Sequence, residues 1–494
     1  MLEFTVDGRL VSVASAFAGA SLLEVLRDQL GVRTPKDGCS PQGQCGCCTV
    51  LVDGQPRVAC VTPARRVEGR TVTTLEGFDP AVRDDWAARF SACGASQCGF
   101  CTPGIITRLA TLPVLDRESV EGALLAHLCR CTGWQTIVEA ALTSPSSGPR
   151  ASQRATLEGG APQAVGPEVA LGRGGFADDT APLDALVAVP SLSGWVVGET
   201  LTEARNLAGK VQGRRSTVPL RWPLEVPPGD WDITLRTTWV EPAYLEPDAA
   251  WCAPGGEPVG PLANGGAFGG KVDSPVAAVA ARLAEEHGRP VRVVMAREDV
   301  VRLGPKRPPI AAGVRSDGTG VVRMVRTRGV AAWFTALGFE VEEVDVPGPP
   351  TSAAIRGAGW VEAAVLRAVA LDDPRVVAPS GGWATASVSP DGIEVVVSAG
   401  PPLDETVLRS YCIGAAHQAL GWVTSEGIAV DEAGIPQDLT IRSFRILRAR
   451  DTPPIHVSAV SGLPSPVNGS DAVFAAVAAA VWKSRGLPPA WPCP

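Results

Sequence analysis

The chain has 494 residues, too many for one ordinary hydrophobic core, so we expect about two to four domains. Hydrophobic residues make up 45% of the sequence and charged residues 19%, a globular composition that excludes a largely disordered chain. The net charge is −8, and no run of Lys or Arg would follow a phosphate backbone, so nucleic acid is not an expected partner.

The first residues lack a basic start followed by an apolar segment, so we expect no signal peptide and a cytoplasmic protein. The longest apolar run, residues 472–482, is far shorter than the ~20 residues that cross a bilayer, and it predicts a buried helix and no membrane partner. Ten of the 13 cysteines lie between Cys39 and Cys131. In a chain without an export signal, such a concentration indicates metal binding or redox chemistry.

The first 77 residues carry the pattern of a β-grasp domain. Strands are expected at 2–6 and 9–13 around an Asp-Gly turn, and at 49–52 and 57–61 around a second one. Between the hairpins, Ser21-Leu-Leu-Glu24 is a capping-box pattern that opens an apolar helix ending at Gly31.

Helical periodicity follows and predicts an all-α domain over residues 78–143, with helices at 82–90, 103–112, 120–128 and 134–142. Residues 144–164 are rich in Ser, Pro and Gly and predict a linker. Residues 165–494 mix strand patterns (195–197, 233–240, 291–295, 393–397) with helical ones (276–286, 407–420, 472–482), which indicates an α+β region. The predicted fold class of the whole chain is α+β.

Two cysteine quartets stand out in the first 143 residues. The first consists of three cysteines of one glycine-rich loop and a fourth in the following hairpin: Cys39, Cys45, Cys48 and Cys60. This spacing resembles the plant-type ferredoxin arrangement with one extra residue in the loop, in which glycines let the loop wrap a [2Fe-2S] cluster. Cys47 is interpreted as an extra thiol. The alternative is a structural zinc site, although zinc sites more often pair two short Cys-x2-Cys knuckles.

The second quartet combines a Cys-x2-Cys and a Cys-x-Cys pattern about 30 residues apart, expected at helix ends: Cys98, Cys101, Cys129 and Cys131. Four thiolates again fit iron and sulfide, with zinc as the competing metal. Cys93 is interpreted as a buried helical cysteine and His127 as a structural residue.

The segments CGxCT, QCGFCTPG and LCRCTGW, in this order over residues 1–142, resemble the iron-sulfur subunit of the xanthine dehydrogenase and aldehyde oxidase family of molybdenum hydroxylases. The resemblance implies two [2Fe-2S] clusters, the second beside a molybdopterin cofactor. It also implies that Gln97 and Cys131 approach the pterin.

The second half resembles the molybdopterin-binding subunit of the same family. Leu245-Glu-Pro matches its LEP segment, Arg356-Gly-Ala-Gly matches its RGxG loop, and residues 264–271 (NGGAFGGK) match its GGxFGGK loop. By resemblance Gly266, Phe268, Gly269, Gly270 and Arg356 would border the cofactor. Taken alone, the glycines would suit close approach to an anionic ligand, or simply a turn between strands, and Arg356 would be an ordinary surface arginine.

Several positions depart from the family pattern. Val240 stands where the family has a glutamine, Val272 stands where xanthine enzymes have a substrate-binding glutamate, and no GQG segment is found. Asp471 occupies the place of the family's catalytic glutamate before a helix, where a carboxylate is more often an N-cap. The second half is also less than half as long as the resemblance would imply.

Two functions therefore remain open from the sequence. The first is a molybdenum hydroxylase-type oxidoreductase that passes electrons from molybdopterin through both clusters to an external acceptor, with Asp471 as base. The second is an electron-transfer or accessory subunit that has lost the molybdenum site. No glycine-rich dinucleotide fingerprint is seen, so an FAD-binding subunit or another acceptor is an expected partner, and a further molybdenum subunit or a homodimer is a second expectation.

Overall fold

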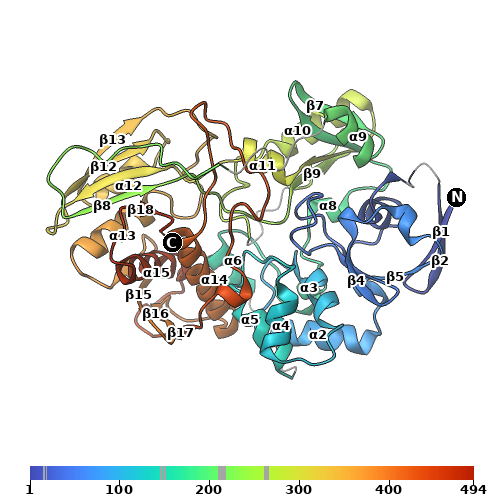
Figure 1. Cartoon of the computed structure of the whole chain (residues 1–494), viewed down its shortest axis with the longest axis horizontal. Coiled ribbons are helices and arrows are strands. Elements are labelled where there is room, and N and C mark those ends of the chain that lie inside the picture. Colours follow the sequence, from blue (N-terminus) through green and yellow to red (C-terminus); the bar gives the residue numbers. More distant parts are fainter. Residues whose placement is uncertain are drawn as a thin grey trace.

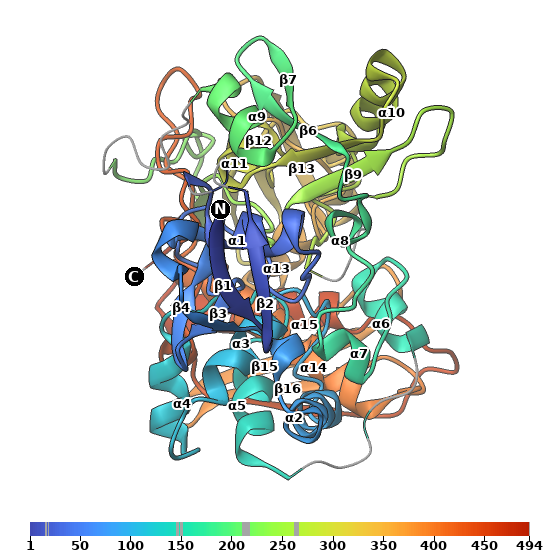
Figure 2. The same ribbon diagram turned by 90° about the vertical axis from the view of Figure 1, so that its right-hand side faces the viewer.

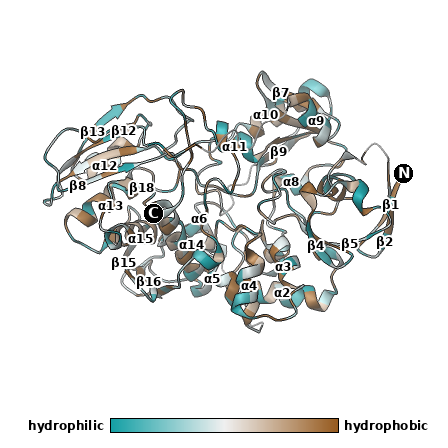
Figure 3. Ribbon diagram, in the orientation of Figure 1, coloured by the Kyte–Doolittle hydropathy of each residue, from teal (hydrophilic) through white to brown (hydrophobic). Residues whose placement is uncertain are grey.

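The computed structural model describes residues 1–14, 17, 19–144, 148, 152–209, 218–260 and 266–493, and it shows a mixed fold of helices and β-sheets. The N-terminal sheet and the helices that follow it lie at one end, and the C-terminal half lies at the other (Figure 1). Hydrophobic and hydrophilic residues are interspersed in every part of the fold (Figure 3). Among the described residues, no helix has the length and apolarity needed to cross a membrane.

The N-terminal sheet has five strands in the order β2-β1-β5-β3-β4. Both predicted hairpins are present, and Asp7 and Asp53 each have φ 49° in the two Asp-Gly turns. Its strands are β1 (Leu2–Val6), β2 (Arg9–Val13), β3 (Thr49–Val52), β4 (Gln55–Val58) and β5 (Thr71–Thr73). The strand predicted at 57–61 is β4, which ends at Val58 because residues 59–61 form a 3-10 turn, η3 (Ala59–Val61), so Cys60 does not lie on a strand.

The predicted helix after the first hairpin is present as α1 (Leu22–Glu24), continued by the π-helical turn η2 (Val25–Gln29). Ser21 caps it, since its hydroxyl accepts the Glu24 N–H at 3.1 Å. The second half of the expected capping box is absent. The Glu24 carboxylate instead accepts from the backbone N–H of Thr202 at 3.0 Å, a contact with the second half of the chain.

All four predicted helices of the next segment are confirmed, with boundaries shifted by a few residues. They are α2 (Pro80–Ala92), α3 (Thr102–Leu109), α4 (Arg117–Leu124) and α5 (Gln135–Leu142). Cys101 is the N-cap residue of α3, and the Cys129–Cys131 segment lies in the connection between α4 and α5. Short 3-10 turns η4 (Ala64–Val67) and η5 (Leu75–Gly77) connect the sheet to these helices.

The linker prediction is wrong for residues 152–159, which form α6 (Ser152–Gly159). The side chains of Arg154 and Glu158 are fully buried and pair at 3.0 Å one turn apart. Glu158 also accepts from the backbone N–H groups of Gly469 at 3.1 Å and Ser470 at 2.9 Å. A helix that buries an ion pair carries no apolar stripe, which explains why periodicity did not indicate it. Residues 145–147 and 149–151 of the predicted linker lie outside the described residues.

The second half begins with a four-stranded sheet in the order β7-β6-β10-β9, which lies close to the N-terminal sheet (Figure 2). Predicted strands 195–197 and 291–295 and helix 276–286 are confirmed here. The strands are β6 (Leu186–Ser191), β7 (Gly194–Gly198), β9 (Asp248–Cys252) and β10 (Val291–Met295). The helices are α7 (Pro167–Ala170), α8 (Ala177–Thr180), α9 (Leu201–Ala208), α10 (Val276–His287) and α11 (Arg297–Leu303).

Two further sheets, ordered β13-β12-β11-β8-β18 and β14-β15-β16-β17, make up the C-terminal part. The first comprises β8 (Ile233–Thr237), β11 (Ile310–Val314), β12 (Gly320–Val325), β13 (Phe339–Val344) and β18 (Ala490–Trp491). The second comprises β14 (Val376–Val377), β15 (Trp383–Ser389), β16 (Gly392–Ser398) and β17 (Ile455–Ala459). The helices are α12 (Ala331–Ala336), α13 (Trp360–Ala370), α14 (Glu405–Thr424) and α15 (Ser470–Ser484), with the 3-10 turn η6 (Ala449–Asp451). The apolar run 472–482 is the buried interior of α15, as predicted.

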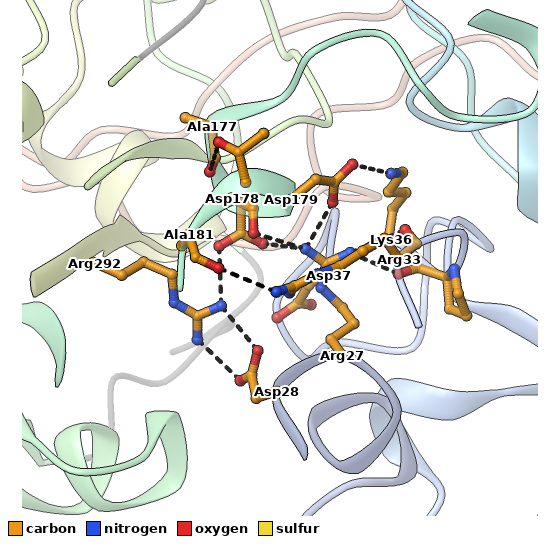
Figure 4. Close-up of polar contacts among 12 residues, drawn as sticks. Arg27, Asp28, Arg33, Lys36, Asp37, Ala177, Asp178, Asp179, Ala181 and Arg292 are labelled. Atoms are coloured by element: carbon orange, nitrogen blue, oxygen red, sulfur yellow. Dashed lines mark hydrogen bonds and ion pairs between the residues drawn. The ribbon is translucent and has the colours of Figure 1, made fainter. Parts of the chain in front are cut away.

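A buried ion network joins the N-terminal sheet region to the second half (Figure 4). Arg27 of η2 pairs with Asp178 of α8 at 2.6 Å and with Asp179 at 2.9 Å, and Lys36 also pairs with Asp179. Arg292 of β10 pairs with Asp178 at 3.3 Å. These contacts link residues 114 to 152 positions apart, so they fix the loop before Cys39 against the later sheet.

Candidate functional site

The first quartet lies in a buried pocket of thiols formed by the loop after residue 38 and by η3. Cys39 contacts the thiols of Cys45 and Cys60, and Cys60 also contacts Cys48. Backbone N–H groups point at two of the sulfurs, Gln44 N at 3.3 Å from Cys39 Sγ and Cys60 N at 3.4 Å from Cys48 Sγ. The Cys45 and Cys60 thiols donate hydrogen bonds that hold the pKa of Cys39 well below its ordinary value, which favours the thiolate that binds metal.

The four cysteines of the second quartet come together where the segment before α3 meets the connection between α4 and α5. The Sγ atoms of Cys98 and Cys131 are 3.6 Å apart, and Cys101 contacts Cys129. The hydrogen bond from the Cys101 thiol lowers the pKa of Cys129 to about 6, and the Thr132 hydroxyl, 3.1 Å from Cys129 Sγ, contributes to the shift. Each quartet therefore holds one thiol with a lowered pKa.

All 13 cysteines are free of disulfides. Within the described part of the chain, no three His, Cys, Asp or Glu side chains are grouped around the position of one metal ion. Cys93 is half-buried and contacts Thr143 at 3.5 Å, outside both quartets.

Cys47 occupies a place that sequence reasoning did not anticipate, between the two quartets. It is fully buried, and the charges of both Cys48 of the first quartet and Cys129 of the second raise the pKa of its thiol. A hydrogen bond from Cys45 lowers the pKa of Cys47, but burial and the neighbouring sulfurs outweigh it, so the net shift is upward.

A direct hydrogen bond joins the backbones of the two quartets. The Leu128 N–H, next to Cys129, donates to the Cys45 carbonyl at 2.9 Å. Gly46 packs against the His127 ring so closely that a Cβ at Gly46 would lie 2.4 Å from His127 Nδ1. The pKa of His127 is lowered to about 3 because burial disfavours its charged form, so His127 serves as a neutral packing partner between the quartets.

The glycine loop of the second half packs directly on the second quartet. A Cβ at Gly266 would lie 3.1 Å from Cys131 Sγ, so only glycine allows this approach without a shift. Gly269 has φ +85°, and a Cβ there would lie 1.7 Å from the Ala354 carbonyl oxygen. The loop is held to the Arg356 segment by the hydrogen bond from Arg356 N to the Phe268 carbonyl at 3.0 Å. Asn264 and Gly265 lie outside the described residues.

Two sequence motifs meet at the end of this loop. Lys271, the last residue of the GGK segment, forms a buried ion pair with Glu246 of the LEP segment at 2.8 Å. Lys271 Nζ also donates to the Pro247 carbonyl at 3.2 Å. Both side chains are less than a tenth exposed, so the pair fixes the glycine loop relative to β9.

Gln97 is buried beside Cys131. Its amide nitrogen donates to the Cys131 carbonyl at 3.0 Å and to the Ser410 carbonyl at 3.1 Å, which ties the second quartet to α14. Its Oε1 atom is buried and has no hydrogen-bond partner. A buried carbonyl oxygen without a donor costs free energy, so this atom marks a place where a ligand N–H fits.

Arg356 is the centre of a polar cluster with residues at the start of α15. Its Nε lies 2.8 Å from Asp471 Oδ1, and it donates to the Ser470 hydroxyl at 2.7 Å. The guanidinium also lies over the rings of Phe268 and Phe474, at 5.2 and 5.4 Å. The alternative of an ordinary surface arginine is wrong, because the Arg356 side chain is only 9% exposed.

Asp471 is not an N-cap. Gly469 is the N-cap residue of α15, and the side-chain oxygen of Asn468 accepts the Asp471 N–H at 2.9 Å. The carboxylate of Asp471 is therefore turned to Arg356 and remains 32% exposed. The helix start is served by Asn468 and Glu158 instead, which is why capping by Asp471 is not needed.

Two small cavities lie on either side of Arg130, a residue that sequence reasoning passed over although it lies inside the LCRC motif. A cavity of about 20 Å³ is lined by Cys98, Cys101, Cys131, Gly266 and Arg130. A cavity of about 30 Å³ is lined by Arg130, Val240, Phe268, Arg356 and Glu426, among others. Residues of the second quartet and the glycine loop thus line one cavity, residues of the glycine loop and the RGxG loop line the other, and Arg130 borders both.

Family models match both halves of the chain. Residues 74–142 match a [2Fe-2S] binding domain, and residues 261–333 match a molybdopterin cofactor-binding domain. The chain is 38% identical over 148 residues to the nicotine 6-hydroxylase small subunit of Paenarthrobacter nicotinovorans, covering 29% of this chain and 88% of that protein. It is likewise 38% identical over 148 residues to the xanthine dehydrogenase iron-sulfur-binding subunit of Escherichia coli O157:H7, covering 28% and 91%.

The chain belongs to the xanthine dehydrogenase and aldehyde oxidase family of molybdenum hydroxylases. It is an oxidoreductase of this family, with [2Fe-2S] clusters and molybdopterin as the family's cofactors. The whole fold is similar to the aldehyde oxidoreductase of Desulfovibrio gigas, with a TM-score of 0.71 at 14% identity over 97% of each chain. At that identity, the structural match shows a shared fold alone.

Proposed function

We propose that this family member passes electrons from a molybdopterin site through the second quartet and then the first to an external acceptor. The observation that carries this proposal is the unbroken line of contacts from the glycine loop to the first quartet. Gly266 touches Cys131, and the Leu128–Cys45 hydrogen bond then joins the second quartet to the first. Buried, packed contacts of this kind are what an electron path between fixed centres requires.

The two quartets fit [2Fe-2S] clusters in their donor chemistry. Each offers four thiols, one of them with a lowered pKa, and the first also offers backbone N–H groups to its sulfurs. Hydrogen bonds to cluster sulfurs are one of the means by which proteins set the potential. We assign Cys39, Cys45, Cys48 and Cys60 to the first cluster and Cys98, Cys101, Cys129 and Cys131 to the second. The five-stranded sheet around the first would be a β-grasp domain (1–77), followed by a helical cluster domain (78–143).

The residues around the glycine loop also fit a molybdopterin. The unpartnered Gln97 Oε1 would accept from a pterin N–H, and Cys131 would lie beside it. Gly266, Gly269 and Gly270 let the loop pack tightly against Cys131, the Ala354 carbonyl and Tyr244, and Phe268 would cover the site with Arg356 at its edge. When bound, molybdenum supplies the two-electron oxidation of a substrate carbon.

Asp471 is the residue we propose to move the proton in this reaction. Its carboxylate is 32% exposed and accepts a hydrogen bond from Arg356 Nε at Oδ1, and its other oxygen would take a proton from a molecule in the site. Arg356 would thus orient the base, while Phe268 and Phe474 exclude water from one side of the guanidinium.

A specific observation favours the second function, an accessory subunit without molybdenum. The guanidinium of Arg356 is already engaged by Asp471 and Ser470, and the cavity beside it has a volume of only about 30 Å³. Val240, which replaces a polar family residue, lines this cavity. A closed, internally paired site of this kind would suit a subunit that relays electrons from a partner.

Partner subunits are part of the proposal in either case. Several relatives are named as subunits, such as the small subunit of nicotine 6-hydroxylase and the beta subunit of the 6-hydroxypseudooxynicotine dehydrogenase complex. By analogy, an FAD-binding subunit would take the electrons, and a further molybdenum subunit or a second copy of this chain would complete the assembly. We expect the complex to work in the cytoplasm.

Elemental analysis of anaerobically purified protein tests both functions. We expect about four iron and four acid-labile sulfide per chain, from two [2Fe-2S] clusters. Zinc in place of iron would refute the cluster assignment. About one molybdenum with pterin per chain would support the hydroxylase, whereas full cluster content without molybdenum, from cells able to make the cofactor, would select the accessory role.

A further inference from the structure

Arg130 occupies a position between the second cluster and the candidate molybdenum site. In sequence it lies between Cys129 and Cys131, two proposed ligands of that cluster. In space this residue lines the cavity against Cys98 and Cys101 as well as the cavity against Phe268 and Arg356. Arg130 is therefore part of the wall that separates the two centres.

The guanidinium of Arg130 is held by a buried carboxylate from the second half. Its Nη1 and Nη2 atoms pair with the two oxygens of Glu426, the second of them at 2.7 Å. Its Nε donates to the Pro242 carbonyl at 2.7 Å, and Gln418 donates to the Arg130 carbonyl at 3.0 Å. The side chains of Arg130 and Glu426 are 6% and 1% exposed, so water hardly screens either charge.

Stability alone is a weak reason for such a pair. A buried ion pair costs so much desolvation that apolar side chains of similar volume often serve as well. A charge in a poorly screened interior, however, acts strongly on any neighbouring centre whose own charge changes. The second cluster is such a centre, because reduction adds one negative charge to it.

We propose that the Arg130–Glu426 pair sets the reduction potential of the second cluster, and with it the direction of electron flow across the wall. This inference rests on the proposed assignment of Cys98, Cys101, Cys129 and Cys131 as cluster ligands. The positive charge of Arg130 stabilises the reduced cluster, and the negative charge of Glu426 offsets that effect. In the reaction, one electron passes to the oxidised cluster, no bond breaks, and the pair keeps its protons.

The charges predict shifts of opposite sign in the two single variants. Glu426→Gln leaves an uncompensated positive charge and raises the potential of the second cluster. Arg130→Gln removes the positive charge beside the cluster and lowers its potential, most strongly at a pH high enough to keep the unpaired Glu426 ionised. The double variant removes both charges and returns the potential toward the wild-type value. A purely structural role would give shifts of the same sign, or loss of the cluster, in both single variants.

The experiment is a potentiometric titration of the anaerobic holoprotein with dithionite and mediators, followed by the EPR signal of each cluster. We expect each single variant to change the ratio of reduced to oxidised second cluster at least tenfold at fixed potential, a shift of about 59 mV for one electron. The first cluster is the internal control, and its potential should stay at the wild-type value. Shifts of one sign in both variants, or shifts well below tenfold, would overturn the proposal.

A matched control is available on α14, the helix that ends shortly before Glu426. Arg409 of α14 forms a bidentate pair with Glu139, at 2.7 and 2.9 Å, but both side chains are about a third exposed. Glu139→Gln makes the same chemical change as Glu426→Gln and should leave both potentials unchanged. An equal shift in the control would show that the effect is not specific to the wall and would refute the inference.

Two further outcomes are distinguishable. Arg130→Gln is compared only if it retains the second cluster. If it does not, Glu426→Gln is compared with the double variant Arg130→Lys/Glu426→Gln. This double variant keeps a positive charge at position 130, so the potential of its second cluster must be raised in the same way. A wild-type potential in that double variant would contradict the proposal. If the wild-type protein itself contains no second [2Fe-2S] signal, the proposed function has failed, and the failure is visible before any variant is compared.

Discussion

Replacing Asp178 with asparagine should loosen the attachment of the N-terminal iron-sulfur region to the second half of the chain. Asp178 contacts both Arg27 and Arg292, at 2.6 and 3.3 Å, and its side chain is 11% exposed (Figure 4). Breaking a buried ion pair by removing one partner typically costs about 3–5 kcal/mol. Since Arg27 keeps Asp179 and Arg292 keeps Asp28, we expect a loss of stability near the lower end, about 3 kcal/mol.

The pKa of Asp178 gives an independent measure of the same effect. Burial alone would raise this pKa, but the charges of Arg292 and Arg27 outweigh burial and lower it to about 2, from 3.8. A lowered folded-state pKa means that the contribution is fully present above about pH 4 and is lost as the pH falls through about 2. At about 1.36 kcal/mol per pKa unit, it amounts to about 2.5 kcal/mol.

The assay is urea and thermal unfolding of the anaerobic holoprotein at pH 7, with acid unfolding as the second measurement. We expect the first unfolding transition of Asp178→Asn to move to lower temperature by roughly 6–12 °C, since about 1 kcal/mol shifts a domain of this size by 2–4 °C. The variant should also lose the part of its acid sensitivity that lies between pH 4 and pH 2.

The control is Asp230→Asn, which removes the same charge from an exposed position. Its expected effect is within about 0.5 kcal/mol. If Asp178→Asn is as stable as this control, the ion network does not hold the two regions together, and the reasoning from burial and charge is wrong.

Three other predictions concern the candidate site. Gly269→Ala should destabilise the glycine loop and lower the molybdenum content, because a Cβ there would lie 1.7 Å from the Ala354 oxygen; unchanged molybdenum content by elemental analysis would contradict it. Glu158→Ala should cost about 3–5 kcal/mol in urea unfolding, because it leaves Arg154 charged and buried; a loss under 1 kcal/mol would show that the pair is not needed. Cys129→Ser should abolish one EPR signal and leave the other, and the loss of both or of neither would refute the assignment of the quartets.

The position of Cys47 gives a further reason to treat the two quartets as one unit. A buried thiol between them, a backbone hydrogen bond from Leu128 to Cys45, and the neutral ring of His127 fill the space that separates them. Close packing of this kind fixes the separation of two centres, since interiors at crystal-like density deform little.

The grouping of the two quartets could be predicted from sequence because their cysteines follow local spacing rules. Three cysteines of the first lie in one loop, and the second combines two short motifs, so neighbouring residues already carry the signal. The same holds for the helix at 472–482, whose continuous apolar run is a local property of the sequence. The resemblance to the family rests on the same short segments.

Other features depend on pairs that are far apart in the chain. Glu24 reads as the second half of a capping box, yet its carboxylate binds Thr202, and Asp471 reads as an N-cap, yet it binds Arg356. In each case a distant partner with an opposite charge or a free donor outcompetes the local contact. Residues 152–159 likewise have the sequence pattern of a linker. Arg154 and Glu158 stabilise a helix there only because the fold buries them together as an ion pair.

The sequence by itself determined which cysteines form the two quartets, the order of the elements and the family, because these follow from local spacing and composition. The tertiary structure alone decided that Arg130 meets Glu426, 296 residues away, and that Asp178 holds Arg27 and Arg292 together. The physical reason is that the interaction energy of a charged side chain depends on its burial and on its partner in space. Neither can be inferred from the residues beside it in the sequence.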